Sequence, residues 1–163
     1  MNLKWLFEKW NLSSLKVNVK FLEAEFTPKD EDKDAAWALY VELLTRITTQ
    51  ELKDEDGDEK TALDSVYQLF PLTRSILKEY GRNCIHFSKI AVVVLNQIIR
   101  PFTAKWHKLL LNGYLDQDDK KREFRNELKI LQQQLQYYTS LLSDLAEVED
   151  LTGLEEKNPL REN

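Results

Sequence analysis

The chain begins with two segments whose apolar residues follow different periods. In residues 2–11, four apolar residues lie at helical spacing: Leu3, Leu6, Phe7 and Trp10. This spacing predicts a short amphipathic helix that packs on the domain or on a partner. Between residues 15 and 26 apolar and polar residues alternate, which predicts a half-buried strand. Since a lone strand is unstable, we expect it to form a hairpin with its own continuation or to pair with a second chain.

Four longer amphipathic segments follow and predict four long helices, at about residues 32–52, 59–80, 85–111 and 117–148. Pro71 and Pro101 fall inside the second and third of them. A proline within a helix removes one hydrogen bond and clashes with the carbonyl four residues earlier, so we expect both helices to be kinked. The predicted fold class is mostly α: a bundle of four long helices, two of them proline-kinked, with an N-terminal helix and a strand or hairpin packed outside.

The predicted domain organisation is a single helical domain over residues 1–150, in which residues 1–28 form the N-terminal appendage. Residues 151–163 lack periodicity and predict a flexible tail.

The last predicted helix carries a heptad seam of apolar residues spaced alternately four and three apart. Such a seam packs along a long partner helix. The partner is either the first or third long helix of the same chain, or the same helix of a second chain. The residues predicted to form this interface are Leu128, Leu131, Leu135, Tyr138 and Leu142.

Composition favours one soluble domain in a reducing compartment. The 163 residues are 42% hydrophobic and 31% charged, with few glycines and prolines. The single cysteine, Cys84, rules out an internal disulfide and favours the cytoplasm. Charged residues interrupt the N-terminal segment, so we expect no secretory signal. The longest uncharged stretch, residues 90–99, is far shorter than the roughly 20 residues that span a bilayer, so we expect no membrane span.

Charge is unevenly distributed along the chain. No acidic residue occurs between Tyr80 and Leu115, a segment of charge +5 in a chain of net charge −5, which leaves −10 for the remainder. In one interpretation this segment is a central helix whose cations pair with acidic neighbours. In the other it forms a local patch for an anion or nucleic acid, with Arg100, Lys105 and Lys108 as the contacts.

Several kinds of site are excluded by the residues that are missing. The chain has no Gly-rich phosphate loop, no G-x-S-x-G or H-E-x-x-H motif and no pair of cysteines. Cys84 and His86 could supply two metal ligands, but no further cysteine and only one other histidine exist. The acidic segment 53–60 lacks the ordered ligands of a calcium loop. We therefore expect neither a metal nor another cofactor.

Four polar residues form a stripe on the third predicted helix, beside its apolar face: Asn96, Arg100, Thr103 and His107. Polar groups at the border of a core need hydrogen-bond partners. The candidates are Glu42 and Arg46 on the first long helix, or Asp64 and Gln68 on the second. We therefore interpret the stripe as a partly buried network that fixes the register of the helices.

Arg100 and His107, with six residues between them, also resemble the R-x4-6-H motif of HEPN-type ribonucleases. Members of that family are small all-helical proteins that commonly act as dimers. The resemblance implies that Arg100 and His107 are catalytic. They would activate the ribose 2′-hydroxyl and stabilise the phosphate transition state without a metal.

Three further segments, AAWALYVELLTRITTQ, ALDSVYQLFPLTR and VLNQIIRPFTAKWHKLL, resemble a family of bacterial helical proteins associated with defence against phage. This resemblance assigns a role to no residue. The sequence leaves three hypotheses. The first is a non-enzymatic interaction or regulatory module that acts with a protein partner or as a homodimer in a multi-protein system. The second is a metal-independent ribonuclease, and the third is a sensor of a nucleotide or another anion.

Overall fold

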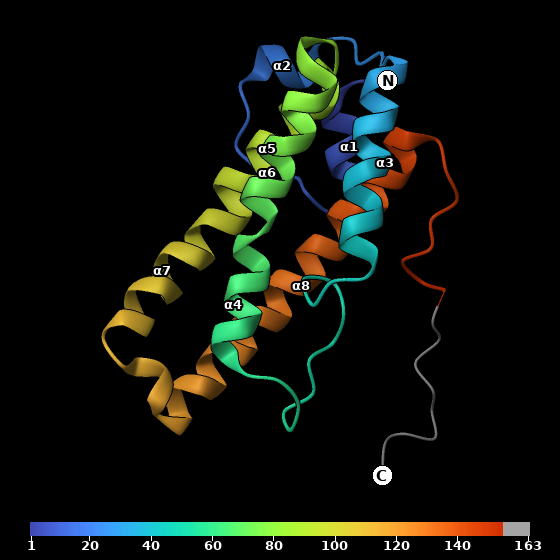
Figure 1. The fold of residues 1–163 in the computed structure, drawn as a ribbon. Helices are drawn as coiled ribbons and strands as arrows, with labels where there is room; N and C mark the ends of the chain where they lie inside the picture. The colour runs from blue at the N-terminus through green and yellow to red at the C-terminus, as the bar shows by residue number, and fades with distance from the viewer. Residues whose placement is uncertain (155–163) are drawn as a thin grey trace.

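The computed structural model describes residues 1–154 and consists mostly of helices, as predicted (Figure 1). The α-helices are α1 (Leu3–Lys9), α2 (Val19–Glu23), α3 (Asp30–Leu44), α4 (Glu59–Tyr67), α5 (Leu69–Tyr80), α6 (Ile85–Val94), α7 (Arg100–Leu111) and α8 (Asp118–Ala146). A π-helical turn, η2 (Leu95–Ile99), joins α6 to α7. Short 3-10 turns, η1 (Gly81–Asn83) and η3 (Tyr114–Asp116), precede α6 and α8. Within these residues no helix has the length and apolarity needed to cross a membrane.

The predicted strand or hairpin at residues 15–26 is wrong: residues 1–154 contain no strand, and α2 occupies the middle of this segment. Val19 and Phe21 are 62% and 52% exposed, so the alternating residues do not form one buried face. The Lys16 backbone pairs with a side chain instead of a strand. Its N–H donates to Gln97 Oε1 (2.8 Å), and its carbonyl accepts from Gln97 Nε2 (2.7 Å).

The first long helix, predicted to reach residue 52, ends as α3 at Leu44. Residues 45–50 form turns, and three of their carbonyls accept from glutamines of α8. Gln132 Nε2 donates to the carbonyls of Ile47 and Gln50, at 2.7 Å each, and Gln136 Nε2 donates to Thr49 O at 2.9 Å. Because these side chains hydrogen-bond the free carbonyls, the helix can end early without leaving them unpaired.

Each internal proline coincides with an interruption of the helix in the turn before it. Pro71 has no N–H to donate to the carbonyl of Tyr67, and α4 ends at Tyr67, with Gln68 between it and α5. Before Pro101 the helix widens into η2, in which the Arg100 N–H donates to the carbonyl of Leu95. In place of the second predicted helix the structure has α4 followed by α5. In place of the third it has α6, η2 and α7.

The heptad seam of α8 lies in the protein's own core. None of its five predicted interface residues is more than 3% exposed: Leu128, Leu131, Leu135, Tyr138 and Leu142. The helix that packs most extensively against α8 is α3, which belongs to the first long helix of the prediction. The seam is thus an intramolecular contact and presents no surface to a second chain.

A buried carboxylate links the beginnings of two helices. Asp32, in the first turn of α3, is 0% exposed. Its Oδ2 accepts from the N–H of Lys29 (2.9 Å), which precedes α3, and its Oδ1 accepts from the N–H of Phe87 (2.8 Å), in the first turn of α6. Backbone N–H groups at a helix start have no partner within the helix, so one carboxylate caps α3 and α6 together.

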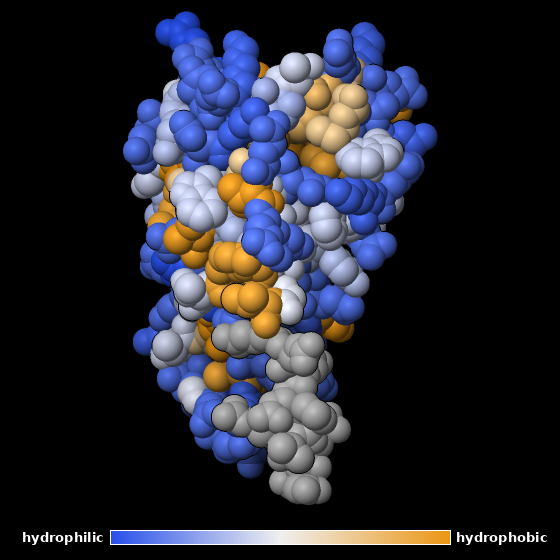
Figure 2. Space-filling view, turned by 90° about the vertical axis from the view of Figure 1, so that its right-hand side faces the viewer, coloured by the Kyte–Doolittle hydropathy of each residue, from blue (hydrophilic) through white to orange (hydrophobic). Residues whose placement is uncertain are grey.

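The chain after α8 returns along α3. The hydroxyl of Tyr40 donates to Glu149 O (3.1 Å) and accepts from Leu151 N–H (2.7 Å), and Leu151 packs against the core. Figure 2 views this side of the molecule, where several apolar side chains gather on the surface. Trp37 and Val41 of α3 are 47% and 42% exposed. Most of the predicted flexible tail, residues 155–163, lies outside the described residues.

We expect Asp32→Ala to lower the free energy of unfolding by about 2–4 kcal/mol, because the buried N–H of Phe87 and the partly buried N–H of Lys29 lose a charged acceptor. Chemical denaturation monitored by circular dichroism measures this change. Asp34→Ala, an exposed position of the same helix, is the matched control and should stay within about 0.5 kcal/mol of the parent. Equal effects of the two substitutions would contradict the capping role of Asp32.

Candidate anion-binding pocket

Helices α4 and α5 on one side and α7 on the other enclose a cavity of about 230 Å³, which we call the α5–α7 pocket. Its lining residues are Tyr67, Phe70, Arg74, Arg100, Thr103, Ala104 and His107. Three of the four residues of the predicted polar stripe therefore meet at one cavity. The fourth, Asn96, lies one turn before Arg100 and contacts its guanidinium.

Arg100 lies at the surface with no acidic partner in the described chain. Its Nε donates to Asn96 Oδ1 (3.1 Å), and its guanidinium lies over the ring of Phe70, 4.8 Å from the centroid. None of the candidate partners, Glu42 and Arg46 or Asp64 and Gln68, bonds to Arg100 within residues 1–154, so the predicted network is wrong for this residue. Glu42 pairs instead with Arg46 at 2.8 Å, within α3 and the turn after it. The stacked ring fixes the plane of the guanidinium and leaves both terminal nitrogens free of ion pairs within residues 1–154.

Arg74 of α5 is a second arginine of the pocket, which no pattern in the sequence singles out. It is exposed, and its Nε donates to the Phe70 carbonyl one turn earlier (3.3 Å). None of the ion pairs found within residues 1–154 involves Arg74, Arg100 or His107. Two arginines and an imidazole thus line one cavity, and no carboxylate of residues 1–154 forms an ion pair with any of them.

The other polar groups of the pocket differ in their availability. Thr103 is buried, and its hydroxyl donates within its own helix to the carbonyls of Ile99 and Arg100, at 3.2 Å each. This hydroxyl is therefore occupied by the backbone. His107 is half-buried, and its ring meets the ring of Tyr67 edge-on, with 5.3 Å between the centroids. Tyr67 is 44% exposed, so its ring lies at the rim of the cavity.

The predicted basic patch of Arg100, Lys105 and Lys108 is not assembled as expected. Lys105 extends to α8, where its ammonium pairs with Glu127 and with Glu123 (3.2 Å). The hydrogen bond to Glu127 raises the pKa of Lys105; burial opposes this effect, and the hydrogen bond to Glu123 adds to it. Lys108 is exposed but does not line the cavity. The cation that lines the cavity together with Arg100 is therefore Arg74, and neither Lys105 nor Lys108.

The Cys84 and His86 pair shows a different environment. The buried Cys84 thiol donates to the Gly81 carbonyl (3.1 Å). The Nδ1 atom of His86 is buried without a partner among residues 1–154, and its ring packs edge-on against Phe26 at 4.8 Å. Burial lowers the pKa of His86, although the nearby Asp32 carboxylate opposes this effect. The described part of the chain holds no cluster of three or more residues suited to bind a metal.

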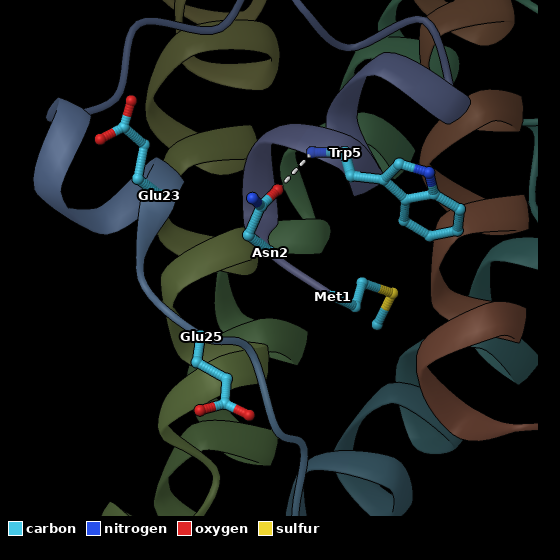
Figure 3. A pocket seen from close by; sticks show the side chains of 5 residues that line it. All are labelled: Met1, Asn2, Trp5, Glu23 and Glu25. Atoms are coloured by element: carbon cyan, nitrogen blue, oxygen red, sulfur yellow. Dashed lines mark hydrogen bonds between the residues drawn. The ribbon is translucent and has the colours of Figure 1, made fainter.

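A second hollow, of about 430 Å³, lies beside the N-terminus and is lined by Met1, Asn2, Trp5, Glu23 and Glu25. Figure 3 shows that the side chains of Glu23 and Glu25 extend in opposite directions. The Asn2 side-chain oxygen is occupied by the N–H of Trp5 (2.9 Å), which it caps at the start of α1. The polar groups of this second hollow do not converge, so the smaller α5–α7 pocket is the better candidate site.

Comparison of this chain with protein-family models, with curated proteins and with solved structures gives no match. The side chains of the α5–α7 pocket are therefore the basis on which a function can be proposed.

We expect stability to fall as the pH drops below about 6.5, through the lowered pKa of His86. Because the unfolded chain binds this proton more tightly than the folded one, the contribution is complete above the unfolded pKa and is lost as the pH falls through the folded pKa. Proton NMR titration of the imidazole resonances measures the folded pKa, and a His107→Gln variant assigns them. A His86 midpoint at or above 6.5 would contradict the prediction.

Proposed function

We propose that this protein is a non-enzymatic regulatory module that binds a phosphate-bearing ligand in the α5–α7 pocket. The observation that carries the proposal is the meeting of Arg74 and Arg100 at one cavity with no ion-pair partner for either among residues 1–154. In a chain with 28 acidic and 23 basic residues, two such arginines at one cavity favour an anionic ligand.

The geometry of the two guanidinium groups supports phosphate as the anion. A guanidinium presents parallel N–H groups that match two oxygens of a phosphate, and such charge-assisted hydrogen bonds are stronger than neutral ones. Each arginine is already held through Nε, by Asn96 Oδ1 for Arg100 and by the Phe70 carbonyl for Arg74. The terminal nitrogens are therefore positioned before the ligand arrives, which lowers the entropy cost of binding.

A regulatory role follows from where the two arginines lie. Arg74 belongs to α5 and Arg100 is the first residue of α7, immediately after η2. A phosphate bound by both would connect α5, three residues after Pro71, to α7, directly before Pro101. It would favour the arrangement in which both arginines reach it. The exposed Trp37 and Val41 on α3 support a contact with a protein partner or a second copy as part of the same proposal.

We expect Arg100→Ala and Arg74→Ala each to weaken binding of inorganic phosphate about tenfold or more, because each removes charge-assisted hydrogen bonds. Isothermal titration calorimetry at low ionic strength measures the dissociation constant. Arg122→Ala is the matched control, since Arg122 is an exposed arginine of α8 outside the pocket. The proposal fails if the parent protein does not bind phosphate, or if the three variants bind it equally.

Metal-independent RNA cleavage is a second candidate function. The observation that favours it is that Arg100 and His107, the pair that resembles the HEPN motif, line the same cavity. An imidazole transfers protons near neutral pH, and a guanidinium stabilises the charge that develops on a phosphorane. In this alternative His107 would take the proton of the ribose 2′-hydroxyl while Arg100 and Arg74 would hold the phosphate.

For this second candidate, the expected result is cleavage of single-stranded RNA in the presence of EDTA. His107→Ala and Arg100→Ala should abolish the cleavage, and Arg122→Ala should preserve it. Gel electrophoresis of a labelled RNA over time is the measurement. RNA that stays intact, or that is cut equally by His107→Ala, excludes catalysis by this pair and leaves the binding proposal in place.

A further inference from the structure

The α5–α7 pocket combines its arginines with an aromatic ring at the rim. Tyr67, the last residue of α4, is 44% exposed. Its ring packs against the ring of Phe70, at 5.6 Å between centroids, and meets the ring of His107 edge to face at 5.3 Å. Such an exposed and supported ring beside phosphate-binding groups suits a nucleobase, because every base has a π-face that stacks on aromatic side chains.

The size of the cavity limits what can enter it. Its volume of about 230 Å³ lies below the roughly 300–1,000 Å³ of sites that enclose a whole drug-sized ligand. The cavity can therefore receive one end of a ligand, while the remainder lies on the rim. Arg74, Arg100 and Tyr67 all line the cavity and are all exposed, so an anionic end held by the arginines would leave an aromatic end within reach of Tyr67.

The charge of the protein limits the ligand further. The chain has a net charge of −5 and a pI of about 5.2. Domains that bind long nucleic acids usually present a basic stripe that contacts many phosphates. Here Lys105 is neutralised by Glu123 and Glu127, which leaves the two pocket arginines as the phosphate contacts that the cavity provides. One phosphate group is thus favoured over a long polyanion.

We infer that the ligand is a single nucleotide, held through one phosphate by Arg74 and Arg100 and through its base by the exposed ring of Tyr67. This inference rests on the proposed function, because it needs the two arginines to hold the phosphate. The ring of Phe70 serves both ends of the ligand: it carries the Arg100 guanidinium and supports Tyr67.

Calorimetric titration of the full chain tests the inference with four kinds of probe: inorganic phosphate, ribose 5-phosphate, each of the four nucleoside 5′-monophosphates, and a single-stranded RNA. The RNA is about 12 nucleotides long, within the range of about 4–16 nucleotides that one small binding fold covers. The monophosphates should bind on the order of tenfold more tightly than ribose 5-phosphate, the effect of one stacked base. Tyr67→Leu should abolish this difference without changing the affinity for phosphate. Tyr67→Phe, which keeps the ring, should preserve it.

The possible failures can be told apart. Equal affinity for phosphate, ribose 5-phosphate and the monophosphates overturns the base site and leaves the proposed function standing. No binding of any probe, phosphate included, overturns both. Binding of the RNA without binding of the monophosphates overturns the single nucleotide as ligand, as does a base-dependent affinity that Tyr67→Leu leaves unchanged.

Discussion

The buried carboxylate of Asp32 is the interaction on which the arrangement of the helices depends. It joins the start of α3, which packs along α8, to the start of α6, which continues through η2 into α7. A buried charge is tolerated only where hydrogen bonds replace the lost water, and two helix N-termini supply them. Because Arg100 begins α7, its position in the pocket follows from the anchored helix that precedes it.

The π-helical turn has two consequences for the same succession of helices. It accommodates Pro101, which cannot donate to the carbonyl of Gln97, by moving the hydrogen bond of Arg100 to Leu95. It also carries Gln97, whose amide satisfies both backbone groups of Lys16. One irregular turn therefore fastens the N-terminal segment and begins the helix that carries Arg100 and His107. Its irregular hydrogen bonding contributes to the position of the pocket.

The sequence was informative where neighbouring residues decide the structure. The heptad residues of α8 revealed a helix with one buried face, because their spacing alone defines that face. The sequence did not predict those parts of the structure that are decided by residues far apart in the chain. The backbone of Lys16 pairs with Gln97, and the turns after Leu44 are capped from Gln132 of α8. Arg74 could not be selected, since only the folded arrangement of α5 and α7 places it and Arg100 at the same cavity.

The ion pairs separate the cations that hold the structure from those open to a ligand. Arg125 is 11% exposed, pairs with Glu59 at 2.8 Å and donates to the carbonyls of Lys53 and Asp56, so it fastens the loop before α4 to α8. Within residues 1–154, Arg74 and Arg100 make hydrogen bonds only through Nε, each to a group one turn away, and Arg100 also lies over the ring of Phe70. Exposed ion pairs add little stability, so their absence at the pocket costs folding almost nothing. The exposure that makes these two arginines dispensable for folding also leaves their terminal nitrogens accessible to an anion.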